Sequence, residues 1–463
     1  MRGRSERRCS RTERRYDKNH CRTGPPCGPK SGKENEPLAE ITPAAKVRRP
    51  LPLSRQMVNA QTAKAYADAW KAADEGKPIG WSTAIFAQEV CEVFDIPVLY
   101  PENNCATMSA RHLGEAYIAE AEGALRYPIN ICSYSRLNLG YASKLLSEPA
   151  SIPHEAPYLP KPTFLLLTNN SCTQLMKWYE NLSEMFHVPI FFIDALFNSY
   201  EEEPKPHKIR YVRSQIESYI AQMEKFLGRR FDWEKFYEVQ KISQENCRLF
   251  DEIVALNRRR PAPMSGFDLF NYMSCLVICR GKRSTTEIFK QLKKEIEEHI
   301  ANGTSTFPSE EKYRVHWEGI ACWPNLGFNL KTLKNYNVNA VMNGYVTAWD
   351  VLYTPGNLDE MARAYQCSST NSFSTPAIMQ KRVDSIRDFG CEGMLCHVNR
   401  SCKLMTFHIH VGREIVDEKA HVPVATFDGD QSDPRIFNEA QFETRLQGLV
   451  EIMEEKKEGA ANV

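Results

Sequence analysis

Two cysteines of this chain end the same short motif, Asn-x-Ser-Cys, at residues 169–172 and 399–402. An apolar run precedes each copy, so each thiol is expected in a polar loop just past a buried strand. Cys132 lies in a third loop of this kind, after the apolar residues Ile129 and Ile131. A cysteine in such a loop can ligate a metal or, as a thiolate, act as a nucleophile.

Metal ligation is the first chemistry that these thiols suggest. The chain has 15 cysteines but no Cys-x2-Cys pair of the kind found in zinc sites and ferredoxins. Cys132, Cys172 and Cys402 are separated by 40 and 230 residues, so no local motif joins them. If the fold brings them together, three thiolates can hold a [4Fe-4S] cluster and leave one iron without a protein ligand. That iron can bind an oxygen and transfer an electron.

The other cysteines differ in their surroundings. Cys275 and Cys279 lie in an apolar helical segment and Cys396 lies within a strand, so all three are expected to pack in the core. Cys105 and Cys322 are ambiguous. Either one as a fourth ligand would favour a cluster that transfers electrons without touching a substrate.

A cysteine hydrolase or transferase is a weaker alternative. Its nucleophile needs a nearby base and a group that orients this base. His397, His408 and His410 lie near Cys402 in the sequence, but their spacing places none of them against the thiol.

The elements that must position the thiols form a repeated unit. A strand ends in Asn-x-Ser-Cys, a helical segment follows, and a second strand opens with Val-Pro, at 164–194 and again at 393–428. Parallel strands need such a crossover helix, and ligands bind outside the carboxyl ends of parallel strands. We therefore expect an α/β protein with two Rossmann-like halves and mainly parallel sheets, and thiols that meet in a cleft between the halves.

Apolar periodicity predicts the remaining elements. Helices are expected at 55–74, 86–94, 109–123 and 439–457, and strands at 78–81, 96–100, 313–321 and 338–342. Residues 210–305 carry helix-period apolar residues and few strand signals, which indicates a helical insertion. The proline-rich stretch 149–162 is expected to be a linker.

The composition is typical of a globular protein with several domains. The chain of 463 residues exceeds one ordinary core, and 42% of its residues are hydrophobic. We expect a disordered basic extension at 1–55, a first α/β domain at 56–209, a helical region at 210–305 and a second α/β domain at 306–463. No apolar run reaches the roughly 18 residues that span a bilayer, so no membrane contact is expected.

The first 50 residues differ from the rest in charge. They hold 14 Lys and Arg against 6 Asp and Glu, while the remainder of the chain carries a net charge of −7. Such a segment cannot bury a core, and it lacks the apolar stretch of a secretory signal. Nucleic-acid binding is less favoured than an inert extension or a start codon placed too early. Many cysteines without a secretion signal indicate a reducing, cytoplasmic location.

The motifs together resemble those of a known family. From about residue 60 onward the chain resembles the α subunits of the 2-hydroxyacyl-CoA dehydratases, within the larger family that includes benzoyl-CoA reductase. The resemblance rests on Gly80-Trp-Ser82, Tyr100-Pro-Glu-Asn103, Cys132-Ser-Tyr134, Asn169-Asn-Ser-Cys172, Lys177-Trp-Tyr-Glu180, Gly266-Phe-Asp-Leu-Phe-Asn271, Trp317-Glu-Gly-Ile320, Cys322-Trp-Pro324, Asn399-Arg-Ser-Cys-Lys403, Asp428-Gly-Asp-Gln431 and Asp433-Pro-Arg435. Segments such as Trp317-Glu-Gly-Ile-Ala321 resemble the lactoyl-CoA dehydratases most, which implies a short acyl chain.

This resemblance implies roles for particular residues. The three protein ligands of a [4Fe-4S] cluster would be Cys132, Cys172 and Cys402, and the remaining iron would take an oxygen from water or substrate. Ser82 and Glu102 stand at the positions of the family's active-site serine and glutamate, although Thr83 could replace Ser82.

The implied reaction explains the need for a cluster. In a 2-hydroxyacyl thioester the hydroxyl leaves from Cα and the proton from Cβ, whereas the carbonyl acidifies the proton on Cα. One electron added to the carbonyl gives a ketyl radical anion that expels hydroxide, and the resulting enoxy radical has an acidic Cβ proton. The resemblance thus implies that a short-chain (R)-2-hydroxyacyl-CoA such as lactoyl-CoA is converted to the enoyl-CoA and water.

The resemblance also implies partners. The family takes its electron from an ATP-dependent iron-sulfur activator protein and pairs this subunit with a β subunit in an anaerobic heterodimer. The chain has no Gly-x4-Gly-Lys-Ser/Thr loop, which is consistent with ATP use by another protein. A benzoyl-CoA reductase-type subunit, which keeps the electrons in its product, is the alternative within the family. A non-catalytic electron-transfer subunit is the alternative of a different class.

Overall fold

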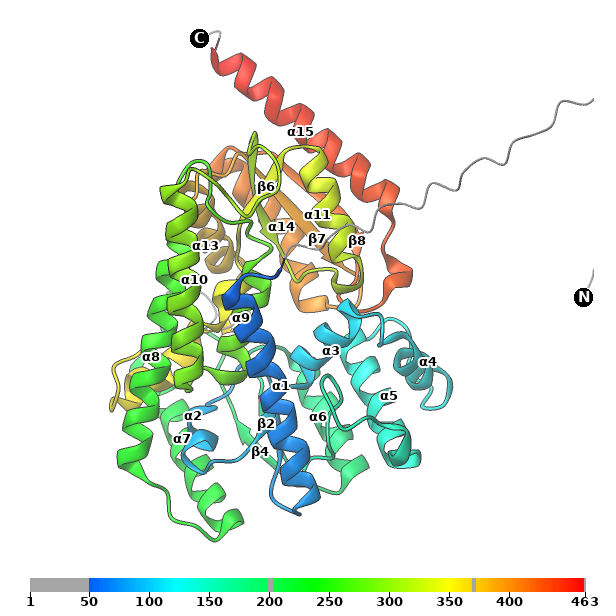
Figure 1. Ribbon diagram of the computed structural model, residues 1–463, viewed down its shortest axis with the longest axis vertical. Coiled ribbons are helices and arrows are strands. Elements are labelled where there is room, and N and C mark those ends of the chain that lie inside the picture. Colours follow the sequence, from blue (N-terminus) through cyan, green and yellow to red (C-terminus); the bar gives the residue numbers. More distant parts are fainter. Residues whose placement is uncertain (1–49, 199–202, 369–371, 462–463) are drawn as a thin grey trace, which may run out of the picture. The chain divides into compact units, whose positions relative to one another are not determined.

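The computed structural model describes residues 50–198, 203–368 and 372–461. In this part the chain forms two four-stranded sheets, with strand orders β2-β1-β3-β4 and β6-β5-β7-β8 (Figure 1). The strands are β1 (Gly80–Ser82), β2 (Val98–Leu99), β3 (Phe164–Thr168), β4 (Ile190–Ile193), β5 (Tyr313–Glu318), β6 (Val338–Asn343), β7 (Gly393–Asn399) and β8 (Val424–Gly429). All their pairings are parallel. This confirms the predicted α/β class with two Rossmann-like halves, and both halves have the same topology.

The repeated sequence unit is a repeated structural unit. It comprises β3, α6 (Thr173–Phe186) and β4 in the first half, and β7, α14 (Lys403–Ala420) and β8 in the second. Both helices end at a histidine with a left-handed backbone, His187 at φ 55° and His421 at φ 57°. This conformation terminates a helix and turns the chain toward the Val-Pro that opens the next strand.

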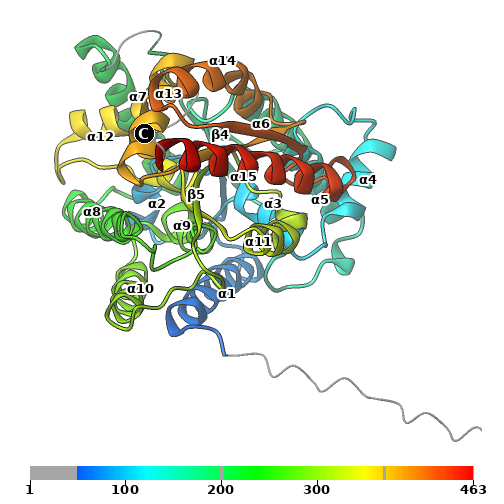
Figure 2. The same ribbon diagram turned by 90° about the horizontal axis from the view of Figure 1, so that it is seen from above.

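Helices cover both faces of the second sheet, which explains why its strands are apolar runs rather than alternating ones. On one face, α11 (Leu326–Asn335) and α15 (Glu439–Ala461) contact each other, and on the other face α13 (Thr375–Asp388) contacts α14 (Figure 2). β5 and β6 are buried along their whole length. Because helices cover both faces of this sheet, a ligand site is expected beyond the carboxyl ends of its strands.

The predicted helical insertion is present between the two sheets in the sequence. It consists of α7 (Pro206–Leu227), α8 (Trp233–Leu256), α9 (Leu269–Cys279) and α10 (Arg283–Ala301). α9 is buried at nine of its eleven positions, whereas its neighbours α8 and α10 are amphipathic and bury one face. α7 packs on β4 and on α12 (Leu358–Cys367), and the N-terminal helix α1 (Leu53–Asp74) packs on α9 and α10.

The first half contains more helix than its sequence predicted. β2 has only two residues, and α3 (Pro101–Ala110) begins directly after Tyr100. Proline is favourable at the first position of a helix and an acidic residue is favourable in its first turn, and Pro101 and Glu102 supply both. The other helices of this half are α2 (Glu89–Val93), α4 (Glu115–Gly123) and α5 (Ser133–Ser147).

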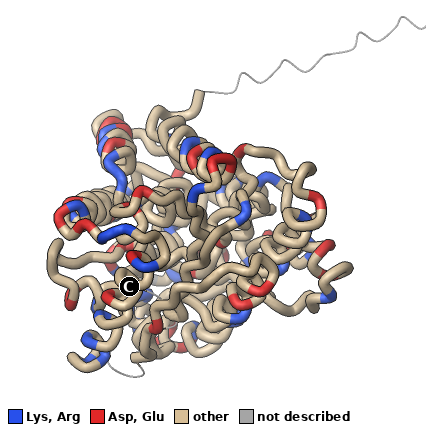
Figure 3. Tube along the Cα trace, turned by 90° about the horizontal axis from the view of Figure 1, so that it is seen from below, with Lys and Arg blue, Asp and Glu red and all other residues tan. Residues whose placement is uncertain are grey.

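Contacts group Leu51–Val463 into one compact unit, separate from Met1–Pro50. The boundaries proposed at residues 209 and 305 stay predictions. Of the basic extension expected at 1–55, residues 1–49 lie outside the described part of the chain, whereas residues 53–55 belong to the first turn of α1. No helix in the described ranges is both long and apolar enough to cross a membrane. Acidic and basic residues are interspersed along the trace in Figure 3.

Candidate functional site: a cavity lined by three cysteines

A cavity of about 110 Å³ lies at the carboxyl ends of both sheets. Its wall includes residues that follow seven different strands: Ile85 after β1, Glu102 after β2, Cys172 after β3, Ile320 after β5, Tyr345 after β6, Cys402 after β7 and Gln431 after β8. Both sheets reverse their strand order between the first and third strands, where open α/β sheets bind ligands. The cavity therefore lies where this topology favours a ligand.

Cys132, Cys172 and Cys402 all line this cavity. Each one directly precedes a helix, α5, α6 and α14 respectively. The sulfur of Cys172 accepts a hydrogen bond from the N–H of Gln174 at 3.4 Å. The backbone of Ser135 and that of Met405, in the first turns of α5 and α14, act to lower the pKa values of Cys132 and Cys402. Helix N-termini carry partial positive charge, so three of them favour thiolates at this place.

Burial acts against ionisation of the same thiols. It raises the pKa of Cys132 to about 12 and also raises the pKa values of Cys172 and Cys402. Cys172 adds to the shift of Cys132, and both add to the shift of Cys402, because thiolates at these positions repel one another. Three thiolates here would need a strongly cationic ligand.

The three thiols can be compared with the ligands that a single metal ion and a cluster each require. Across the described ranges, no three His, Cys, Asp or Glu side chains form a group that could hold one metal ion. A four-iron cluster requires its cysteine ligands to be farther apart than the ligands of one ion, because each cysteine binds a different iron. Three thiols around one cavity, each presented by a different helix N-terminus, fit that demand.

Hydrogen bonds between the two halves hold Cys132 beside the other thiols. The N–H of Ser133 donates to the hydroxyl of Ser401 at 3.0 Å, which ties the neighbours of Cys132 and Cys402 together. The Gln431 amide donates to the Cys132 sulfur at 3.4 Å. The N–H of Cys132 donates to the side chain of Gln174, in the helix that follows Cys172, at 3.2 Å. The positions of the three thiols therefore depend on both halves.

Glu102 is the carboxylate of the cavity. Its Oε2 accepts a hydrogen bond from the N–H of Ala84 at 2.6 Å, and burial raises its pKa to about 7. A carboxyl group with this pKa can take or give a proton near neutral pH.

Ser82, the other predicted catalytic residue, is fully buried at the end of β1 and is not among the described residues that line the cavity. Its hydroxyl donates to the carbonyl of Thr83 at 2.9 Å. The hydroxyl of Thr83 in turn accepts from the N–H of Thr168 at 3.3 Å. The structure thus places Glu102 in the same cavity wall as the thiols, whereas Ser82 and Thr83 are buried and do not belong to the described part of that wall.

The two ambiguous cysteines lie outside this cavity wall. Cys105 donates to the carbonyl of Tyr134 at 3.4 Å, and Cys322 lies 3.3 Å from Nε2 of His397. All of these side chains are buried. His397 therefore pairs with Cys322 rather than with Cys402. The cysteines expected to pack in the core are buried: Cys275, Cys279 and Cys396.

Sequence reasoning missed several residues of the wall. Tyr134, Tyr345, Trp349 and Arg382 line the cavity, and no local pattern distinguishes them from core or surface residues. Only Tyr134 could have been found from the sequence, because it belongs to the motif Cys132-Ser-Tyr134.

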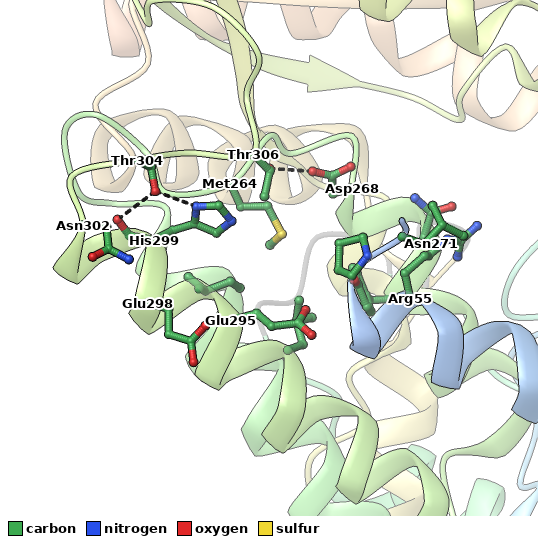
Figure 4. Close-up of a pocket in the computed structure, with 15 residues that line it drawn as sticks. Arg55, Met264, Asp268, Asn271, Glu295, Glu298, His299, Asn302, Thr304 and Thr306 are labelled. Carbon is green, nitrogen blue, oxygen red and sulfur yellow. Dashed lines mark hydrogen bonds between the residues drawn. The ribbon is translucent and has the colours of Figure 1, made fainter. Parts of the chain in front are cut away.

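Further cavities adjoin the first. One of about 310 Å³ shares four wall residues with it, Glu102, Tyr134, Tyr345 and Trp349. Another of about 530 Å³, at the start of α1 and the end of α10, shares Arg55 and Asn271 with the second (Figure 4). In its wall Thr306 donates to Asp268 at 2.6 Å and Thr304 pairs with His299 at 2.8 Å.

The sequence matches a family model described as "2-hydroxyglutaryl-CoA dehydratase, D-component" over residues 83–453. The chain is 45% identical to "(R)-2-hydroxyisocaproyl-CoA dehydratase alpha subunit" of Clostridioides difficile, over 87% of this chain and 97% of that protein. It is 38% identical to "(R)-phenyllactyl-CoA dehydratase alpha subunit" of Clostridium sporogenes, over 84% and 93% of the two chains. With "Lactoyl-CoA dehydratase subunit alpha" of Anaerotignum propionicum the identity is 36%, over 87% and 96%.

Proposed function

Because the chain belongs to the 2-hydroxyglutaryl-CoA dehydratase D-component family, we propose that it is the α subunit of a 2-hydroxyacyl-CoA dehydratase. The enzyme would convert an (R)-2-hydroxyacyl-CoA to the enoyl-CoA and water. The observation that carries the proposal is the cavity that Cys132, Cys172, Cys402 and Glu102 line together.

The three cysteines would hold a [4Fe-4S] cluster in this cavity. Such a cluster supplies an electron to the thioester carbonyl and an open coordination position for the leaving oxygen. Cys132, Cys172 and Cys402 would bind as thiolates, aided by the helix N-termini at which they lie. Glu102, with its pKa of about 7, would move a proton during departure of the hydroxyl or loss of the Cβ proton.

The apolar residues in the wall of the cavity favour a substrate with an apolar acyl chain. Ile85, Leu175, Leu404 and Met405 contribute to it. Three relatives, 36–45% identical, act by their names on hydroxyisocaproyl, phenyllactyl and lactoyl thioesters, which have apolar substituents. A relative named for 2-hydroxyglutaryl-CoA, whose substituent is charged, is 32% identical. We assign this chain to the apolar substrate class.

The adjoining cavity of about 310 Å³ offers a place for the pantetheine arm of the thioester. Arg55 and Arg111 lie in its wall, and their charge suits the phosphates of coenzyme A. Tyr134, Tyr345 and Trp349 separate it from the thiols. The proposal also includes a β subunit and an ATP-dependent activator as partners, since the relatives are named as α subunits.

The electron-transfer alternative finds less support. It needs a fourth protein ligand, and neither Cys105 nor Cys322 belongs to the described wall of the cavity. A benzoyl-CoA reductase-type activity differs in its product, which keeps the electrons.

The test is anaerobic co-purification of the chain with the protein encoded next to it, followed by iron and sulfide analysis. The complex is then assayed with activator, ATP and (R)-2-hydroxyisocaproyl-CoA or lactoyl-CoA. We expect about four irons bound per chain and enoyl-CoA without net reduction of the thioester. A purified complex that binds iron but yields only reduced acyl-CoA would refute the dehydratase assignment.

A further inference from the structure

Arg382 is the one Lys, Arg or His among the described residues that line the cysteine cavity. It lies on α13 and is only 9% exposed. A buried guanidinium stays charged, so it attracts electron-rich groups in a site that excludes water. The cavity thus contains a fixed cation that no step of the proposed reaction has used.

A buried cluster fixes one edge of this guanidinium. Nε of Arg382 donates to Oε2 of Glu318, the last residue of β5, at 2.7 Å. The same carboxylate pairs with Nε2 of His316 at 3.2 Å and with Nε2 of His408 at 3.1 Å. Burial alone would raise the pKa of Glu318, but Arg382 and the two histidines bring it well below its usual value. Glu318 is therefore a carboxylate that orients Arg382.

Gly344 makes room for the rest of the guanidinium. It follows β6 and also lines the cavity. A Cβ at this position would overlap the guanidinium, coming within 2.5 Å of Nη1. The hydrogen bond to Glu318 uses Nε, and among the described residues no hydrogen bond from Nη1 or Nη2 of Arg382 is found.

A 2-hydroxyacyl thioester carries two oxygens on adjacent carbons, the hydroxyl and the carbonyl. The two Nη groups of a guanidinium form a rigid fork that binds such a pair of oxygens. We propose that Arg382 binds the hydroxyl and the carbonyl of the substrate, and that Glu318 positions it with His316 and His408. This inference rests on the proposed function. It gives the site a means to recognise the 2-hydroxyl group and to stabilise the negative charge that develops on both oxygens.

The test is a binding measurement that requires no turnover. The anaerobically purified complex is titrated by calorimetry with (R)-2-hydroxyisocaproyl-CoA and with isocaproyl-CoA, which lacks the hydroxyl. The wild-type protein should prefer the first ligand. Arg382→Gln should lose this preference by about tenfold or more, the usual effect of one hydrogen bond to a charged group. Arg382→Lys keeps the charge but not the fork, and should not restore the preference.

Three further variants separate binding from folding. Arg387→Gln, on the same helix but exposed, should behave as wild type. Glu318→Gln should weaken the preference with unchanged iron content, because the amide keeps the size of the carboxylate but loses the charge that holds Arg382, His316 and His408. Gly344→Ala keeps the charge of Arg382 but displaces its fork, so it should reduce the preference as Arg382→Gln does.

The outcomes are distinguishable. Wild-type preference in a folded Arg382→Gln protein, judged by its thermal unfolding, overturns the role of Arg382 and leaves the proposed function intact. An equal loss for both ligands together with loss of iron would place Arg382 at the thiols instead, and so overturn the inference as well. A wild-type complex that binds neither thioester counts against the proposed function itself.

Discussion

At the scale of single residues, burial opposes the ionisation of the three thiols and of the carboxyl group that line the cysteine cavity. Burial raises the pKa values of Cys132, Cys172, Cys402 and Glu102 alike. Raised thiol pKa values mean that a cluster bound by these cysteines, as proposed, would release their protons. Glu102 can take or give a proton near neutral pH without a bound cation, because burial raises its pKa to about 7.

Replacing any one of Cys132, Cys172 and Cys402 by Ala is expected to remove the cluster and abolish dehydration. Each sulfur occupies a separate part of the cavity wall, so no neighbouring thiol can substitute for it. Iron and sulfide analysis of each purified variant measures the loss. Cys275→Ala is the control, since Cys275 is buried in α9 and should cost only packing, about 1 kcal/mol. Full iron content in Cys402→Ala would disprove its role as a ligand.

Glu102→Gln should bind iron normally but turn over more slowly, and its rate should lose the pH dependence near pH 7 that the wild-type carboxyl group imposes. The same group affects stability. Its pKa of about 7 lies above the value near 4.5 of an unfolded chain, so the folded state holds the proton more tightly. The free energy of unfolding should therefore fall by roughly 3 kcal/mol as pH rises from 4.5 through 7.

Denaturant unfolding of wild type and Glu102→Gln at several pH values measures this difference. The variant cannot ionise at this position, so its stability should fall less over the same range. Parallel pH dependences for the two proteins would mean that Glu102 titrates normally.

At the scale of elements, close helix contacts place Cys132. This residue directly precedes α5, and α5 packs closely on α4 through Gly140. A Cβ at Gly140 would overlap the carbonyl group of Tyr117 and come within 2.8 Å of its carbon. Both partners are backbone, so the two helices would have to separate.

We expect Gly140→Ala to destabilise the protein by about 2–3 kcal/mol, as overpacking in a rigid core does. It should also reduce iron content, because a displaced α5 carries Cys132 away from the cavity. Thermal unfolding and iron analysis check both effects. Gly448→Ala in α15 is the matched control. Nothing lies within 4 Å of its added Cβ, so it should be neutral or stabilise by about 0.5–1 kcal/mol. Equal stability of the two variants would contradict the predicted steric role of Gly140.

At the scale of the whole described unit, a buried network around Glu89 joins the two halves and the helical insertion. Glu89 belongs to α2, and Arg280 directly follows α9. Nε of Arg280 donates to Glu89 at 3.4 Å, while Ser243 of α8 and Tyr365 of α12 donate at 2.8 Å and 2.6 Å. Burial would raise the pKa of Glu89, but Arg280 and these bonds bring it below its usual value.

Arg280→Met should destabilise the protein by about 3–5 kcal/mol, because it leaves a carboxylate buried without its cation. Arg283→Met is the control: its ion pair with Glu245, at 2.6 Å, is exposed, so its loss should cost less than about 1 kcal/mol. Urea denaturation measures both. A small effect of Arg280→Met would mean that Glu89 becomes protonated and neutral in the variant, and Glu89→Gln in the same background should then change nothing further.

The sequence by itself determined the α/β architecture and the place of two cysteines, Cys172 and Cys402, in it. Strand-forming runs and the repeated Asn-x-Ser-Cys and Val-Pro motifs are local signals, and parallel pairing follows from the helical crossover between them. Cys172 and Cys402 then had to lie past the carboxyl ends of β3 and β7, as they do.

Only the tertiary structure decided which loops meet. Local patterns report whether a residue is buried but not which distant residue faces it, so no sequence pattern indicated that Arg382 of α13 lines the cavity. For the same reason Ser82 and Glu102 were indistinguishable as polar residues after short strands. In the fold, the helix that begins at Pro101 carries Glu102 into the cavity wall, while the hydroxyl of Ser82 donates a hydrogen bond to the carbonyl of Thr83.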